Sequence, residues 1–285
     1  MDKAVVDLKP YDAEENEEAV ATKEPALAIS GRHIYPLVTG MAFLCLWEAV
    51  VRLADIGAWL LPKPSLVLVA CFTKATTLLP AALVTTEEIL LGFSLSVVIG
   101  IGAALAIVSS RTVEESTYPL LVATQVVPKI AVAPLLIVWL GYGLPPKIMM
   151  AFLISFFPIV VDTIVGLKSI EIGKLQLVQS MGAGTWQSFV KVRLPNALPN
   201  ILGGMKIAST FAVVGAIVGE YIGADEGLGR VILIANGNFD TTMVFAAITY
   251  LTVIGVALFL AVEALEHVLI PWHVSRRADH SISKS

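Results

Sequence analysis

The stretch Ser180–Pro199, "SMGAGTWQSFVKVRLPNALP", is a polar, glycine-rich and basic interruption in a chain dominated by long apolar segments. Of the 285 residues, 56% are hydrophobic and 15% are charged, and the mean hydropathy is +0.82. These values are well above those of soluble domains and are typical of integral membrane proteins. The polar stretch therefore indicates a loop outside the membrane, and the apolar segments on both sides of it indicate membrane spans.

Six segments are long and apolar enough to cross a membrane, which takes about 20 residues of helix. Transmembrane strands would alternate apolar and polar residues, and no such alternation is present, so the fold class predicted is all-α. The predicted spans are Ile34–Ala54, Ile89–Val108, Tyr118–Leu140, Ile148–Leu167, Ile201–Ile222 and Met243–Ile270. The segment Leu61–Pro80 is bracketed by prolines and is too short and mixed to cross, so we expect an interfacial helix there.

The charges predict the orientation of the spans. Residues 1–33 contain eight acidic and four basic residues, a composition typical of a disordered tail rather than of a cleavable signal peptide. With this tail in the cytoplasm, the predicted inner segments hold twelve Lys and Arg residues and the outer segments four. We therefore expect cytoplasmic termini, a membrane domain over residues 34–272 and a cytoplasmic C-terminal tail over 273–285.

The longest inner loop, residues 168–200, has an internal pattern of its own. "EIGKLQLVQSM" and "TWQSFVKV" each place apolar residues on one helical face, and Gly182 and Gly184 separate the two segments. Thr185 is the expected N-cap of the second helix, and Pro195 and Pro199 are expected to mark its end and the start of the next span. The sequence thus predicts two short amphipathic helices joined by a glycine turn.

The spacing from Gly182 over nine residues to Val192, then over one residue to Leu194 and Pro195, resembles the cytoplasmic loop motif of permease subunits of ATP-binding-cassette importers. The first half of that motif, Glu-Ala-Ala, is replaced here by Gln-Leu-Val from Gln176. "PKIAVAPLLIVWLGYG" from Pro128, "GEYIGADEGLGRVI" from Gly219 and other segments resemble the nitrate, sulfonate, taurine and bicarbonate branch. The similarity covers roughly residues 35–272.

This resemblance implies an importer permease fold of the five-helix-core type, with a coupling helix in the loop. It implies contact with the ATPase through the following residues: Gln176, Gly182, Ala183, Trp186, Val192, Leu194 and Pro195. It also implies two ATPase subunits inside, a substrate-binding protein outside and a second permease copy in a bacterial inner membrane. With one permease sequence in hand, a homodimer is the simplest assembly, and the outer segment "GADEGLGRVILIANGNFDTT" is the candidate docking site for the binding protein.

The chain has no Gly-rich phosphate loop ending in Gly-Lys-Ser or Gly-Lys-Thr, so we expect ATP and magnesium to be bound by the partner ATPase. Paired catalytic carboxylates, a metal-ligand cluster and a nucleophile beside a base are not recognisable either, and no nucleic-acid partner is expected. The prediction is a permease subunit without catalytic activity, cofactor or metal of its own.

Ionisable residues inside spans cost about 2.5–3.5 kcal/mol on insertion scales and commonly serve a function. Lys129 follows Pro128, whose missing N–H should loosen the third span there. We hypothesise that Lys129 faces the translocation path, together with Gln125 and Pro128, and attracts an anion or pairs with Asp162 as a gate. A structural ion pair or a snorkelling lysine is the alternative.

Glu220, at the end of the fifth span, has two interpretations: it lines an outer gate, or it is an interfacial carboxylate facing water. Glu48 is expected to pair with Arg52, four residues later on the same helix. The competing function is an ion-coupled secondary carrier that uses Lys129, Asp162 and Glu220 as relay groups. For an importer, the expected solute is a small anion such as nitrate, bicarbonate or a sulfonate, or a small heterocyclic precursor.

Overall fold

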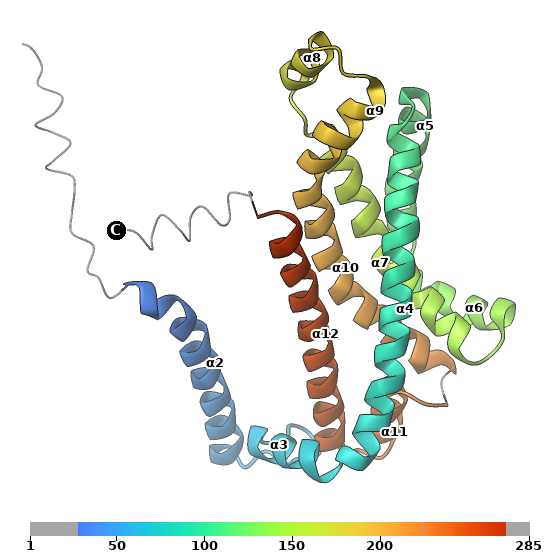
Figure 1. Cartoon of the computed structure of the whole chain (residues 1–285). Helices are drawn as coiled ribbons and strands as arrows, with labels where there is room; N and C mark the ends of the chain where they lie inside the picture. The colour runs from blue at the N-terminus through green and yellow to red at the C-terminus, as the bar shows by residue number, and fades with distance from the viewer. Residues whose placement is uncertain (1–27, 224, 272–285) are drawn as a thin grey trace, which may run out of the picture.

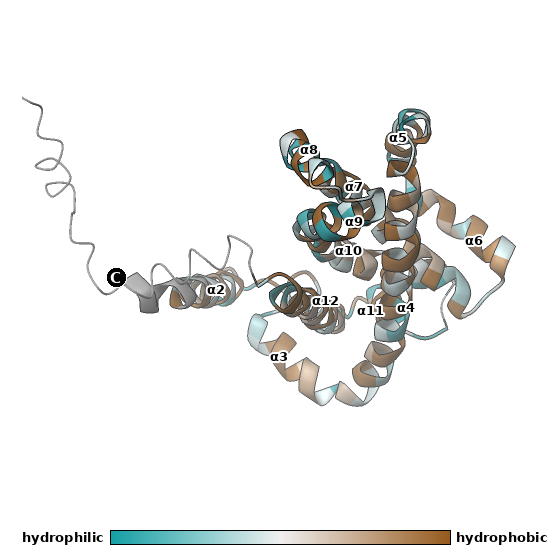
Figure 2. Cartoon of the chain, turned by 45° about the horizontal axis from the view of Figure 1, so that its top comes forward, coloured by the Kyte–Doolittle hydropathy of each residue, from teal (hydrophilic) through white to brown (hydrophobic). Residues whose placement is uncertain are grey.

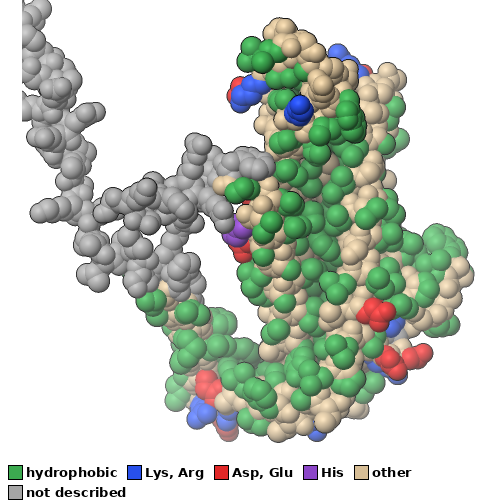
Figure 3. All heavy atoms as spheres, in the orientation of Figure 1, with side chains coloured by type: hydrophobic (Ala, Val, Ile, Leu, Met, Phe, Trp, Pro, Cys, Tyr) green, Lys and Arg blue, Asp and Glu red, His purple; other side chains and the backbone are tan. Residues whose placement is uncertain are grey.

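The computed structural model describes residues 28–223 and 225–271, and these residues form helices joined by short connections. Four helices form an upright bundle: α4 (Ala75–Val108), α7 (Leu144–Lys168), α10 (Leu194–Gly223) and α12 (Thr241–Leu269) (Figure 1). Their outward faces are largely apolar, as Figures 2 and 3 show, and charged side chains gather towards the two ends. Each of these helices, α10 together with the helical turns before it, is long and apolar enough to span a membrane.

The third predicted span is broken. It consists of α5 (Arg111–Gln125), a 3-10 turn over Lys129–Val132 and α6 (Ala133–Leu140), and its two halves meet at 85°. The break falls at Pro128, as the missing N–H predicts. Counted as one span, this pair raises the number of candidate spans in the described residues from four to five.

The first predicted span coincides with α2 (Ala28–Leu53), which is not among those five candidate spans. The upper part of α2 stands apart from the bundle in Figures 1 and 2. Its lower part is attached: the Trp47 ring lies 5.5 Å from that of Phe245 on α12. Glu48 pairs with Arg52 as predicted and also accepts hydrogen bonds from Ser65 N (3.0 Å) and Ser65 Oγ (2.8 Å). The predicted tails 1–33 and 273–285 lie largely or wholly outside the described residues.

The predicted interfacial helix Leu61–Pro80 is correct only as far as Thr73. A short helix, α3 (Pro64–Thr73), crosses below the bundle, but the last six residues of the segment, 75–80, already belong to α4. Pro80 is accommodated inside α4, where its lost hydrogen bond affects only the first turns of the helix. α4 therefore begins fourteen residues before the predicted span start at Ile89 and includes the polar residues Thr85 to Glu88.

Glycines determine how closely α7 and α10 approach each other. A Cβ placed on Gly215 would lie 2.5 Å from the Cα of Ala151, and one on Gly219 would lie 2.8 Å from the Cα of Lys147. At Gly204 the corresponding neighbour is the Asp162 side chain, at 2.8 Å. This close packing without side chains between the backbones is a common way for helices to associate in membranes.

Candidate functional site

The predicted two-helix loop is present at one end of the bundle. Its helices are α8 (Ile172–Ser180) and α9 (Thr185–Ser188), and the chain reverses between them at Gly182, whose φ is +84°. The Gly182 N–H donates to Gln179 O (3.0 Å) and the Ala183 N–H donates to Val178 O (3.3 Å). This pair of bonds is a Schellman C-cap, which requires the left-handed conformation that glycine adopts without strain.

Two details of the loop differ from the prediction. The N-cap of α9 is Gly184 rather than Thr185. The second helix does not end at the prolines, because it continues through a π-helical turn, Phe189–Arg193, directly into α10. Pro195 and Pro199 both lie inside this continuous helical segment, where each lacks a backbone N–H, and the π-helical turn lies directly before Pro195.

The two halves of the motif lie in different surroundings. Gln176 and Gly182 are exposed, Ala183 is half-buried, and the Trp186 side chain is 75% exposed with its ring stacked on Phe189 at 5.9 Å. Val192, Leu194 and Pro195 are half-buried where the chain enters the bundle. The second half of the motif therefore anchors the loop, and the first half lies mostly on its exposed surface.

The predicted path residues are only partly brought together. Lys129, Gln125 and Asp162 line one pocket of about 300 Å³ between α5, α7 and α10, which also contains Phe157 and Phe211. Lys129 and Asp162 form no ion pair, since no nitrogen–oxygen contact within 4.0 Å joins them. Instead, the Lys129 Nζ lies 4.0 Å from the centre of the Phe157 ring, a cation–π contact.

Glu220 lies apart from that pocket and does not face water. Its side chain is 1% exposed; Oε1 accepts a 2.6 Å hydrogen bond from Thr85 Oγ1, and Oε2 accepts one from the Gly229 N–H. The Leu228 N–H in turn donates to Thr85 Oγ1 at 2.9 Å. Glu220 and Thr85 together cap the N-terminus of α11 (Leu228–Gly237), the short helix within the predicted outer loop.

A buried ion pair next to this cap was not predicted. Lys147 Nζ donates to Glu88 Oε1 at 2.8 Å, and the two side chains are 6% and 0% exposed. Lys147 also donates to the Glu226 carbonyl at 3.3 Å. Lys147 lies in a predicted outer segment, and Glu88 directly precedes the predicted span that starts at Ile89. The available signal was the polar run Thr85–Glu88 in otherwise apolar sequence.

A second ion pair that was not predicted joins α10 to α12. Lys206 Nζ binds Glu266 Oε2, and both side chains are about one-fifth exposed. Lys206 lies within a predicted span, where a charge requires a partner. The hydropathy pattern indicates the charge but not which helix supplies the partner.

Comparison with known proteins places this architecture in a family. Residues 96–270 match the family described as "Binding-protein-dependent transport system inner membrane component". The formylaminopyrimidine transport permease protein ThiX of Halalkalibacterium halodurans is 38% identical over 238 residues, covering 83% of this chain and 95% of that protein. The riboflavin transport system permease protein RibX of Chloroflexus aurantiacus is 36% identical, covering 84% and 90%.

The taurine transport system permease protein TauC of Escherichia coli is 32% identical, covering 81% of this chain and 86% of that protein. A solved structure of the inward-facing MetNI methionine ABC transporter shares the fold, with a TM-score of 0.61 and 19% identity over 69% of this chain and 98% of that chain. The chain therefore belongs to the binding-protein-dependent transport inner membrane components, the multi-pass permease subunits of ABC transporters.

Proposed function

We propose that this chain forms the translocation path of an ATP-driven importer and that loop 168–200 is its contact with the ATPase. The observation that supports this most directly is the loop itself: a C-capped glycine turn at Gly182 leads into a helical turn that carries Trp186, which is 75% exposed. Exposed aromatic residues on a rigid turn are typical of protein interfaces. Because α9 continues into α10, a force on the loop would act directly on a membrane span.

The proposed orientation has the loop in the cytoplasm. The α4–α5 junction at Arg111, the α8–α9 loop and the last turn of α12 all lie at one end of the bundle, and α3 and α11 lie at the other (Figure 1). The loop end also contains Lys168, Lys174, Lys191 and Arg193. This clustering of bases supports cytoplasmic placement under the positive-inside rule. The proposed partners are two ATPase subunits at this end, a binding protein at the other and a second copy of the chain.

For the solute, we propose a small planar heterocycle. The pocket contains two aromatic rings, Phe157 and Phe211, with the Asp162 carboxylate and the Gln125 amide available for ring N–H groups. The named relatives ThiX and RibX, which transport a pyrimidine and riboflavin according to their names, support this class. A small organic anion bound by Lys129 is the second candidate, and the taurine relative supports it.

The test is uptake into proteoliposomes that contain the permease, its ATPase and its binding protein. The solute is a labelled aminopyrimidine or labelled taurine, and each is measured with the other present unlabelled as a competitor. ATP-dependent uptake of the heterocycle is expected, and Asp162→Asn should reduce it at least tenfold. If taurine is the solute, Lys129→Met should cause the larger loss. Lys74→Met, at an exposed position between α3 and α4, is the matched control.

Two results would contradict the proposal. Uptake without the ATPase that disappears when an ion gradient is dissipated would favour the ion-coupled carrier. Unchanged ATP-dependent uptake in both Asp162→Asn and Lys129→Met would show that the solute does not pass through this pocket. It would not affect the role proposed for the loop.

A further inference from the structure

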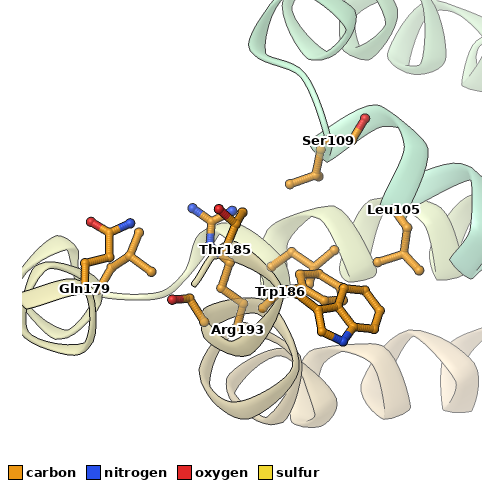
Figure 4. A pocket seen from close by; sticks show the side chains of 11 residues that line it. Leu105, Ser109, Gln179, Thr185, Trp186 and Arg193 are labelled. Carbon is orange, nitrogen blue, oxygen red and sulfur yellow. The ribbon is translucent and has the colours of Figure 1, made fainter. Parts of the chain in front are cut away.

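A second pocket, of about 650 Å³, lies between the coupling loop and the ends of the spans (Figure 4). Its apolar wall is formed by Leu105 from α4, Leu167 from α7 and Phe189 from the π-helical turn. The loop side is formed by α8 and α9. The pocket is separate from the path pocket, with which it shares no lining residue.

Two polar groups in this pocket lack partners among the described residues. The Ser188 side chain is 4% exposed, and its hydroxyl makes no hydrogen bond there. Arg193 is half-buried, and no acidic side chain of the described ranges lies within 4.0 Å of its guanidinium. A buried hydroxyl without a partner carries a cost of about 1–3 kcal/mol, which a ligand oxygen would remove.

The location of the pocket relative to the spans indicates the kind of ligand. α4 ends at Val108 and α7 ends at Lys168, so the pocket lies at the level where the spans leave the hydrocarbon. The lining offers a ligand one unpaired cation, Arg193, one hydroxyl donor, Ser188, and several apolar side chains. Basic pockets at this level between membrane helices are suited to anionic lipid head groups.

We propose that this pocket binds one anionic phospholipid, with the phosphate at Arg193 and Ser188 and part of an acyl chain along Leu105 and Leu167. A free anion would leave the apolar wall unused, and a neutral lipid would leave Arg193 without a counter-charge. The bound lipid would connect the coupling loop to the ends of α4 and α7. This inference requires only that the chain spans a membrane, and it does not depend on the solute or on the ATPase.

Trp186 supplies the probe, because its indole lines the pocket on the same side as Leu105 (Figure 4). The full-length permease is placed in phosphatidylcholine nanodiscs, and phosphatidylglycerol or phosphatidylcholine with brominated acyl chains is added at increasing mole fraction. The quenching measured for Trp186→Phe comes from the other four tryptophans. Subtracting it from the quenching of the wild type gives the quenching of Trp186.

Half-maximal quenching of Trp186 is expected at an about tenfold lower mole fraction of phosphatidylglycerol than of phosphatidylcholine, the effect of one charge-assisted hydrogen bond. Arg193→Gln should reduce this preference below twofold. Lys191→Gln, an exposed cation two residues away, should preserve it. Val108→Phe fills the apolar side of the pocket without changing its charge and should weaken quenching by the bound lipid. This variant keeps the proposal testable if Arg193→Gln folds poorly.

Three outcomes would overturn the proposal. Equal quenching by the two lipids in the wild type would show that no selective site exists. Equal losses in Arg193→Gln and Lys191→Gln would show a general surface-charge effect. Release of the lipid by millimolar inorganic phosphate would identify a site for a free anion rather than for a lipid.

Discussion

Replacing Lys147 with methionine tests whether the buried Glu88 carboxylate in α4 depends on Lys147 as its partner. The Glu88 side chain is 0% exposed, and Lys147 is its hydrogen-bond donor. The other carboxylate oxygen, Oε2, already has no hydrogen-bond partner in the described part of the chain. Lys147→Met would therefore leave both oxygens of a buried carboxylate unsatisfied.

Removing one partner of a buried ion pair costs about 3–5 kcal/mol, and we expect Lys147→Met to lower the free energy of unfolding by that amount. In the double variant Glu88→Gln with Lys147→Met neither charge of this pair remains, and the buried Glu220 keeps its hydrogen bonds from Thr85 and Gly229. Its free energy of unfolding should return to within about 1–2 kcal/mol of the wild type, because replacing both partners avoids the desolvation penalty. The two substitutions should therefore be strongly non-additive.

The measurement is SDS-induced unfolding of the purified chain in detergent micelles, followed by far-ultraviolet circular dichroism, for the wild type, both single variants and the double variant. Arg111→Met is the control, because it removes a cation from an exposed pair with Glu115 whose side chains are 91% and 66% exposed. That control should lose less than about 1 kcal/mol. A loss in Lys147→Met no larger than the control, or a double variant as unstable as the sum of the single variants, would refute this account.

Two further predictions concern glycines and one concerns the α11 cap. Gly182→Val should cost about 1–2 kcal/mol because of the positive φ and should abolish co-purification of the ATPase, whereas Gly173→Ala, also exposed and free of contacts, should not. Gly215→Ala places a Cβ against the α7 backbone and should lower the melting temperature in detergent through an overpacking cost of about 1–3 kcal/mol; Gly203→Ala, with nothing within 4 Å, should not. Glu220→Ala should speed amide exchange in the first turn of α11 more than in α12, since it removes the acceptor of the Gly229 N–H.

Elements that depend on local sequence could be predicted. The glycine turn at Gly182, the break at Pro128 and the pairing of Glu48 with Arg52 follow from backbone freedom, a missing N–H and helical spacing. The apolar spans followed from hydropathy, since each predicted segment coincides with helical structure. These features need no knowledge of which helices are neighbours.

Features that depend on tertiary pairing could not be predicted. Glu88 lies directly before the predicted span start at Ile89, and hydropathy registers its charge but cannot identify its partner Lys147, which is 59 residues away along the chain. For the same reason, pairing with Asp162 was only one of the roles considered for Lys129, and the structure places Lys129 over the Phe157 ring instead. A charged residue inside an apolar segment can be recognised in the sequence, because burying it costs free energy. Its partner is determined by how the helices pack.

The continuity of α9 with α10 links the two ends of the molecule. One apolar helical segment runs over the 39 residues Thr185–Gly223, which at about 1.5 Å per residue is roughly 58 Å. Its first turn carries Trp186, and its last turn carries Glu220, which caps α11 at the opposite end. Because one helical segment joins these two ends, interrupted only by the N–H groups that Pro195 and Pro199 lack and by the π-helical turn, a displacement of the loop can reach the α11 cap along a single helix. Had Pro195 and Pro199 ended the helix, as the sequence suggested, the loop would connect to the span through a hinge, and this direct route to Glu220 would not exist.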